Sequence, residues 1–290
     1  MINEPWCVAW LGNLTGEHAP GIRDLPTAVR VAHQLVRAHA KGSQAVKSES
    51  PHVLVGAVNN LTNPLIVGPA TAENLKDLEI VDGYKNRWWM QGMYEGKYPA
   101  DLVEIFQRET RIFCDENEIG DVSYGRDWIG VNYYNAEVFK GGGNGAELFP
   151  GTTSIDGAGF GEERTDMGWS WTPDGIKETL IQVSQKYPDI PIFLTENGAC
   201  YNYGPSEDGK IHDVKRDEYL ARYISACVDA HKSGVNLKGF YVWSLLDNFE
   251  WAWGFEMRFG LVFVDFKNKM KRTLKESALA YRDLIRSFRS

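Results

Sequence analysis

The 290-residue sequence lacks most features that would tie it to a disulfide framework, a membrane or a nucleotide. Its four cysteines, Cys7, Cys114, Cys200 and Cys227, lie far apart without a CxxC pair, so we expect reduced thiols and no zinc site. It has no run of 18 apolar residues, which argues against a membrane-spanning helix. No Gly-x-Gly-x-x-Gly turn follows an expected strand, so a nucleotide-binding fold has no support.

Further absences narrow the class of protein. The opening residues show no basic region followed by an apolar one, so we expect no signal peptide and a cytoplasmic location. A net charge of -8 argues against nucleic acid as a partner. The six histidines show no metal-like spacing, so no metal and no cofactor is expected.

Aromatic residues are unusually abundant in this sequence. Ten tryptophans and an aromatic fraction of 12% suit either a large core or a site that binds flat apolar faces such as sugar rings, and composition alone favours the core. The hydrophobic fraction of 43% is ample for a folded core, and no linker divides the chain. We therefore expect residues 1–290 to form a single domain.

Strand and helix patterns alternate along the chain. Short, continuously apolar strands are expected at 52–58, 127–134, 191–198 and 237–248. Helices are expected at 27–46, 70–93, 100–118, 172–187, 214–234 and 271–288, with loops at 7–26 and 135–171. This alternation predicts an α/β fold built from βαβ units around a parallel sheet.

Polar residues gather where the expected strands end. They are Asn3, Glu4, Asn59, Asn60, Asn132, Tyr133, Tyr134, Thr195, Glu196, Asn197, Trp243, Asp247 and Asn248. In a (β/α)8 barrel the carboxyl ends of the strands form the catalytic face. Most glutamates are solvated surface charges, but Glu196 directly follows Ile-Phe-Leu-Thr, where the strand should still be buried. Glu4 and Glu196 on one rim would suit cleavage of a glycosidic bond, which needs a proton donor and an ionised carboxylate.

The ordered motifs carry a resemblance to a known family. NEP (3–5), NYY (132–134), TENG (195–198), WSLLDNFEW (243–251) and RFGLVFVDF (258–266) together resemble the family 1 glycoside hydrolases, the β-glucosidase family. Intervening stretches such as TGEHAPGIRD and MGWSWTPDGI fit the same family in the same order. The resemblance covers nearly the whole chain, and the ordered set is far more specific than TENG alone.

The resemblance implies a retaining (β/α)8 enzyme with Glu4 as general acid/base and Glu196 as nucleophile. It implies substrate-binding roles for Asn3, Asn132, Tyr134, Trp243, Glu250, Trp251 and Phe259. The expected substrate is a non-phosphorylated β-D-glucoside or oligosaccharide, with β-galactosides or β-fucosides as seconds, because the Glu250 carboxylate would repel a phosphate. A Tyr134 hydroxyl that donates to Glu196 would favour its ionised form, and an indole offers a flat face to a pyranose.

The resemblance also places Asn3 and Glu4 at the end of the fourth of eight strands. We therefore expect an incomplete barrel, from the end of strand 4 through strand 8 and its helix. No position matches the family's arginine beside the nucleophile or its glycone-binding Gln and His. An open barrel edge would favour a homo-oligomer. A catalytically inactive fragment that only binds glycosides, or a structural role, remains the alternative.

Tryptophans outside the motifs have two interpretations. Trp6, Trp88, Trp89 and Trp128 are expected to pack in the core or against helices. Trp169, Trp171 and Trp253 fall on or beside loops of the expected rim, where either aglycone binding or simple packing fits the pattern.

Overall fold

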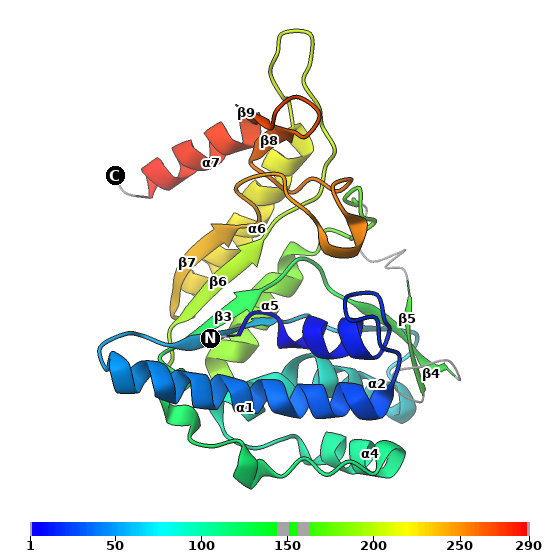
Figure 1. Cartoon of the computed structure of the whole chain (residues 1–290). Helices are drawn as coiled ribbons and strands as arrows, with labels where there is room; N and C mark the ends of the chain where they lie inside the picture. The colour runs from blue at the N-terminus through cyan, green and yellow to red at the C-terminus, as the bar shows by residue number, and fades with distance from the viewer. Residues whose placement is uncertain (1, 144–150, 156–162, 289–290) are drawn as a thin grey trace.

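A four-stranded parallel sheet forms the centre of the computed structural model, which describes residues 2–143, 151–155 and 163–288 (Figure 1). The strand order is β1 (Gly56–Asn60), β3 (Trp128–Asn132), β6 (Ile192–Asn197) and β7 (Leu237–Val242), and every neighbouring pair is parallel. A parallel bridge between Asn3 and Val58 adds the first residues of the chain beside β1. The predicted α/β class and the four predicted strands are confirmed.

Helices connect the strands and cover the sheet. They are α1 (Leu25–Glu49), α2 (Ala72–Asp82), α3 (Trp88–Tyr94), α4 (Ala100–Thr110), α5 (Pro173–Lys186), α6 (Val214–Lys232) and α7 (Glu276–Ser287). The π-helical turn η2 (Gly83–Arg87) joins α2 to α3. Asp24 begins α1 by accepting the Thr27 N–H, which satisfies a backbone donor that the helix itself leaves unpaired. No helix in the described ranges is both long and apolar enough to cross a membrane.

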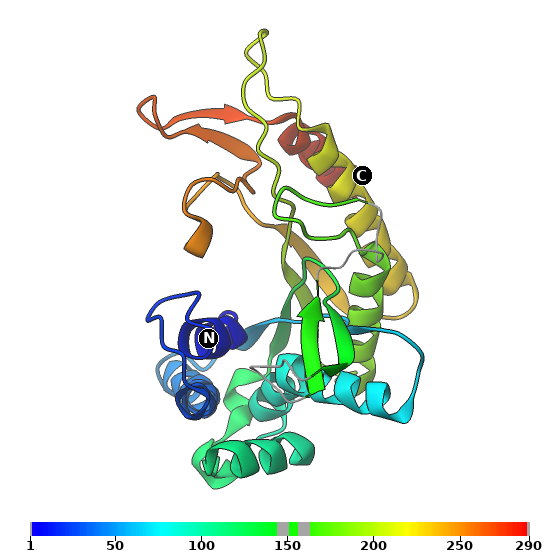
Figure 2. The ribbon, with the colours of Figure 1, turned by 90° about the vertical axis from the view of Figure 1, so that its right-hand side faces the viewer.

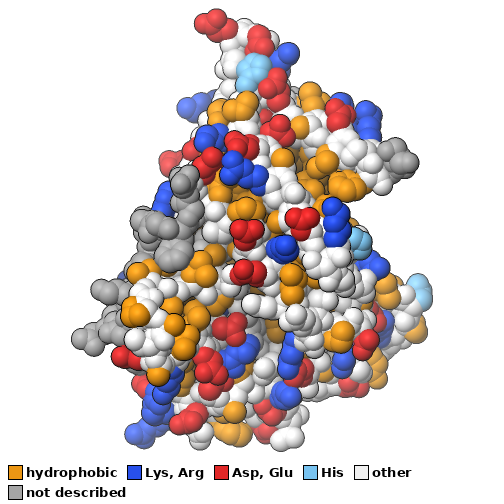
Figure 3. Space-filling view, turned by 180° about the vertical axis from the view of Figure 1, so that it is seen from behind, with side chains coloured by type: hydrophobic (Ala, Val, Ile, Leu, Met, Phe, Trp, Pro, Cys, Tyr) orange, Lys and Arg blue, Asp and Glu red, His pale blue; other side chains and the backbone are white. Residues whose placement is uncertain are grey.

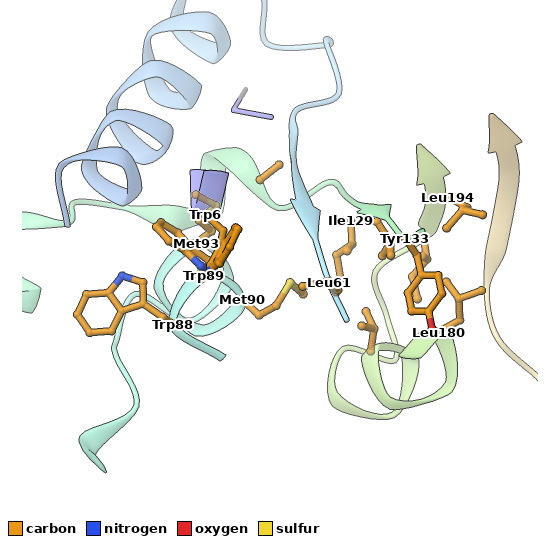
Figure 4. Close-up of a cluster of buried hydrophobic side chains, with 14 of the residues drawn as sticks. Trp6, Leu61, Trp88, Trp89, Met90, Met93, Ile129, Tyr133, Leu180 and Leu194 are labelled. Carbon is orange, nitrogen blue, oxygen red and sulfur yellow. The ribbon is translucent and has the colours of Figure 1, made fainter. Parts of the chain in front are cut away.

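The core joins the helices to the sheet. Figure 4 shows Trp89 and Met93 beside Trp6, with Trp88 farther out, while Ile129 and Leu194 project from the strands. All of these side chains are buried. The expected core roles of Trp88 and Trp89 are thus confirmed, and the packed core fixes the strands whose ends carry the polar residues.

Two predicted loops contain regular structure. Residues 5–13 form a helical run that includes η1 (Cys7–Leu11), because Ala9 and Trp10 bury their side chains completely against the core. The predicted loop at 135–171 contains β4 (Val138–Gly143) and β5 (Gly151–Ile155), which form a small sheet with β2 (Leu65–Val67). Residues 144–150 and 156–162 of that loop lie outside the described residues.

Helix and strand ends also differ from the prediction. Residues 271–274 are not helical: they form β9 (Lys271–Leu274), which pairs antiparallel with β8 (Val262–Asp265). The helix predicted at 100–118 ends at Thr110, because Arg111 has a left-handed conformation with φ 58°. The strand predicted at 237–248 ends at Val242, and the rest of that segment forms a loop.

The far edge of the sheet is open in the described part of the chain. β7 is the last strand in the order, and Tyr241 on it is 54% exposed. Leu245 and Phe249, in the loop after β7, are also largely exposed. From behind, apolar side chains gather beside a hollow in the right-hand outline of the molecule (Figure 3).

Candidate active site

A cavity of about 220 Å³ lies at the carboxyl ends of the parallel strands. Two segments that carry many of its lining residues, the N-terminal helical run and the segment that follows β7, face one another in Figure 2 and form two of its walls. Eight of the nine predicted site residues line it, namely Asn3, Glu4, Asn132, Tyr134, Glu196, Trp243, Glu250 and Trp251. The ninth, Phe259, is buried behind the wall, with its ring 6.1 Å from that of Tyr134 and 5.9 Å from that of Trp169.

Glu4 is positioned by backbone pairing to β1. Val58 N–H donates to the Ile2 carbonyl at 2.9 Å, and Glu4 N–H donates to the Val58 carbonyl at 3.0 Å. Glu4 then adopts φ 46°, a left-handed conformation that costs free energy for a residue with a Cβ. This turn leads directly from the extended segment into the helical run that begins at Pro5, and it leaves the Glu4 side chain in the wall of the cavity.

Asn132 connects the elements that carry the two carboxyl groups. Its Nδ2 donates to Glu4 Oε1 at 2.9 Å and to Asn3 Oδ1 at 3.1 Å. Its Oδ1 accepts a hydrogen bond from Thr195 Oγ1 at 2.7 Å, beside Glu196. The amide at the end of β3 therefore fixes Glu4 relative to β6.

Glu196 lies at the end of β6, and the Tyr134 hydroxyl donates to its Oε2 at 2.7 Å. Burial, and then the nearby charge of Glu4, raise the pKa of Glu196 to about 7. Hydrogen bonds from Tyr134, Asn132 and Asn3 oppose this rise without cancelling it. The predicted Tyr134 contact is present, yet burial and the charge of Glu4 still shift Glu196 toward its protonated form.

The segment after β7 supplies the other wall. Trp243 Nε1 donates to Glu250 Oε2 at 3.4 Å. Burial raises the pKa of Glu250 and the charge of Glu4 adds to that rise, while the Trp243 hydrogen bond opposes it. Trp251 is 60% exposed and stacks on His18, with ring centroids 5.6 Å apart, so the two walls touch at the cavity mouth.

Asp247 anchors this wall to the body of the protein. Its carboxylate accepts hydrogen bonds from Arg258 at 2.7 Å, from Lys275 at 2.8 Å and from the Gly260 N–H at 3.0 Å. The side chains of Asp247 and Lys275 are fully buried, and burial lowers the pKa of Lys275 to about 8. A buried carboxylate with this many donors holds the loop that presents Trp243 and Glu250.

The structure distinguishes the tryptophans that line the cavity from those that only pack, a choice that the sequence did not decide. Trp169 and Trp253 line the cavity, whereas Trp171 is buried and its indole N–H donates to the Tyr201 hydroxyl at 2.8 Å. Trp6, expected to pack, is buried but also forms part of the cavity wall, with Lys85 Nζ 3.3 Å from its ring centroid.

Several lining residues were missed by sequence reasoning. These are Cys7, Glu17, His18, Glu137 and Met167, whereas Asn60, which was expected at a strand end, also lines the cavity. No sequence signal pointed to Cys7, because residues 7–26 were predicted to form a loop, whereas the structure places Cys7 in the helical turn that follows Glu4. Within the described ranges, no three His, Cys, Asp or Glu side chains are grouped so as to hold a metal ion.

The arrangement suits acid/base and nucleophilic chemistry on a polar ring. Glu4 and Glu196 line one cavity, both accept hydrogen bonds, and aromatic faces from two walls surround them. Such a pairing of carboxyl groups with aromatic platforms is typical of glycoside hydrolysis.

Comparisons with known proteins agree. The model of "Glycosyl hydrolase family 1" matches residues 1–289. The chain is 37% identical over 289 residues to the 1,4-beta-D-glucan glucohydrolase of Thermotoga neapolitana, covering 99% of this chain and 63% of that protein. It is 34% identical over 300 residues to the bifunctional beta-D-glucosidase/beta-D-fucosidase of Bifidobacterium breve, covering 98% of this chain and 63% of that protein.

A solved structure shows the same fold. The beta-glucosidase from Thermotoga maritima in complex with deoxynojirimycin superposes with a TM-score of 0.86 at 34% identity, covering 99% of this chain and 62% of the other. The chain thus spans about three fifths of the length of these relatives and has the α/β fold of their TIM barrels over that part. With its motifs, its fold and its match over residues 1–289, the chain belongs to glycosyl hydrolase family 1.

Proposed function

We propose that this chain carries the catalytic carboxyl pair of a retaining glycoside hydrolase that cleaves terminal, non-phosphorylated β-D-glucosides. The observation that carries the proposal is the hydrogen-bonded set in one cavity, in which Asn132 connects Glu4 to β6 and Tyr134 donates to Glu196. The names of the relatives support a glucoside, and the B. breve relative supports a β-D-fucoside as a second substrate.

The reaction proceeds in two displacements. Ionised Glu196 attacks the anomeric carbon while Glu4 passes its proton to the leaving oxygen, so the glycosidic bond breaks and a glycosyl ester forms on Glu196. Glu4, now a carboxylate, then takes a proton from water as that water attacks the anomeric carbon and releases Glu196. Anomeric configuration is retained because the carbon is inverted twice.

The other cavity residues are assigned to binding. Trp243 provides an apolar face for the pyranose ring, and Glu250 accepts hydrogen bonds from sugar hydroxyls. A phosphorylated sugar is disfavoured, because its charge would meet the carboxylate of Glu250 in a partly buried cavity.

The test is hydrolysis of 4-nitrophenyl β-D-glucoside by the 290-residue chain. Activity should be lost in Glu196→Ala and kept in Glu104→Gln, which changes an exposed glutamate on α4. A 2-fluoro-glucoside with a good leaving group should form an ester that mass spectrometry places on the peptide containing Glu196. Activity that survives in Glu196→Ala would refute the assignment.

A second candidate is glycoside binding without turnover. It is favoured by the direction of the shift at Glu196: burial and the charge of Glu4 raise its pKa, and a protonated carboxyl is not a nucleophile. In that case calorimetry would show deoxynojirimycin, the ligand of the T. maritima relative, binding to the chain while no aryl glucoside is cleaved.

We also propose that copies of the chain associate through the open edge of β7. An unpaired strand edge with an exposed apolar residue such as Tyr241 favours pairing with another chain. Sedimentation of the purified chain should show a dimer that Tyr241→Lys converts to monomer, and a monomer in both proteins would refute it.

A further inference from the structure

The thiol of Cys7 lies against the carboxyl group assigned to proton transfer. Cys7 Sγ is 3.4 Å from Glu4 Oε2, within hydrogen-bond distance for sulfur, and the half-buried side chain lines the cavity. The contact arises from the local fold, because the Cys7 N–H also donates to the Glu4 carbonyl at 3.0 Å in the first helical turn. The two side chains are therefore held on the same side of the chain.

Asn60 fixes the direction of the thiol hydrogen. Asn60 Nδ2, at the end of β1, donates to Cys7 Sγ at 3.5 Å. Since the sulfur accepts this bond, its single hydrogen is left to point at Glu4. Asn60 Oδ1 is buried and has no hydrogen-bond partner among the described residues, so the carboxamide contacts Cys7 through its nitrogen alone.

The surroundings keep the thiol protonated. Burial, followed by the charge of Glu4, raises the pKa of Cys7 far above its ordinary value, and only Lys85 among the nearby charges acts in the opposite direction. A thiol that does not ionise near neutral pH is inert as a nucleophile and remains a weak hydrogen-bond donor.

We propose that Cys7 is a positioning residue for Glu4: its thiol, held by Asn60, donates to Glu4 Oε2 and orients that carboxyl for proton transfer. Asn132 holds the other oxygen, Oε1, so both oxygens of Glu4 are fixed. A thiol suits this position because Glu4 must gain and lose a proton. The thiol donates only a weak hydrogen bond to the Glu4 carboxylate, and its sulfur can accept one from the protonated carboxyl. The proposal rests on the proposed role of Glu4 in hydrolysis.

One experiment tests the contact without turnover. The rate of alkylation of Cys7 by iodoacetamide at pH 9 is measured by peptide mass spectrometry in the parent chain, in Glu4→Gln and in Glu250→Gln. Removal of the Glu4 charge should increase Cys7 alkylation several-fold, because one of the two main causes of the raised thiol pKa is gone while burial remains. Glu250→Gln changes a carboxylate of the same cavity that is hydrogen-bonded to Trp243, so it should have little effect on Cys7. The buried Cys114, Cys200 and Cys227 are internal references.

A second experiment tests the role in proton transfer. kcat/KM is compared for phenyl β-D-glucoside, whose leaving group needs a proton, and for 2,4-dinitrophenyl β-D-glucoside, whose leaving group does not. Cys7→Val, which keeps an apolar side chain of similar size but has no donor, should lower kcat/KM about tenfold for the phenyl substrate alone, a fraction of what a full general acid contributes. Cys7→Ser, which restores a donor, should recover most of it.

Three results would overturn either the proposal for Cys7 or the proposed function of the chain. Cys7 alkylation that is unchanged in Glu4→Gln overturns the proposal whether or not the chain is active. Equal losses on both substrates in Cys7→Val also overturn it, because they indicate packing alone. No turnover by the unsubstituted chain overturns the proposed function, while the alkylation rates still decide the contact.

Discussion

Replacing Glu196 with glutamine should stabilise the protein, and the gain should depend on pH. The pKa of Glu196 is about 7 in the folded protein against an ordinary value of 4.5, so between these pH values the folded state binds the extra proton. The sign follows: stability falls as pH rises through this window. The loss reaches about 3 kcal/mol above pH 7 and is only about 1 kcal/mol at pH 5, as obtained from these two pKa values.

Glutamine keeps the size of the side chain and an oxygen that can accept from Tyr134, but it has no charge to bury. Urea unfolding of Glu196→Gln should therefore show a gain that is about 2 kcal/mol larger at pH 8 than at pH 5. Glu104→Gln, on an exposed face of α4, is the control and should show no such difference. An equal gain at both pH values, or a loss at pH 8, would refute the view that burial and the charge of Glu4 outweigh the hydrogen bonds to Glu196.

Three further predictions concern Glu196, the anchor of the wall after β7, and the packing of two glycines. Tyr134→Phe removes the 2.7 Å hydrogen bond that stabilises ionised Glu196, so its pKa should rise by about one and the pH-dependent loss of stability should extend to higher pH in urea titrations. Lys275→Met leaves the buried Asp247 without one of its cationic partners and should cost about 3 kcal/mol in the same assay, whereas a cost below 1 kcal/mol would contradict the anchoring role. Gly56→Ala would place a Cβ against the carbonyl oxygen and ring of Trp128 and should destabilise the protein by more than about 2 kcal/mol. Gly42→Ala, in α1 with open space around it, should instead stabilise the protein by about 1 kcal/mol, and the melting temperatures of the two variants test this difference.

Sequence predicted the strands and most helices because their patterns are strong. The strand cores Ile129, Val131, Ile192 and Leu194 are continuously apolar and fully buried, so no context was needed to recognise them. The helix predicted from Thr27 begins at Leu25 in the structure, where Asp24 caps it and Pro26 lies in its first turn. The motif at the end of each strand then predicted which side chains would share one rim.

Other elements depended on partners remote in the sequence. Residues 271–274 were predicted to begin a helix, but they pair with β8 and form β9. The next residue, Lys275, is buried and forms an ion pair with Asp247. In the helical run at 5–13, Trp10 is fully buried, with its ring 6.0 Å from that of Tyr84 and 5.7 Å from that of Phe106, both distant in the chain. Local pattern could not show these partners, since tertiary contacts override weak propensities.

By itself the sequence determined the family, the parallel sheet and the identity of the residues around the cavity, because each rests on local pattern or on ordered motifs. Only the tertiary structure decided the protonation of Glu196, the separation of Trp171 from Trp169, and the contact of Cys7 with Glu4. These properties depend on burial and on distances between residues far apart in the chain or turned toward one another by the backbone. Such quantities exist only once the chain has folded.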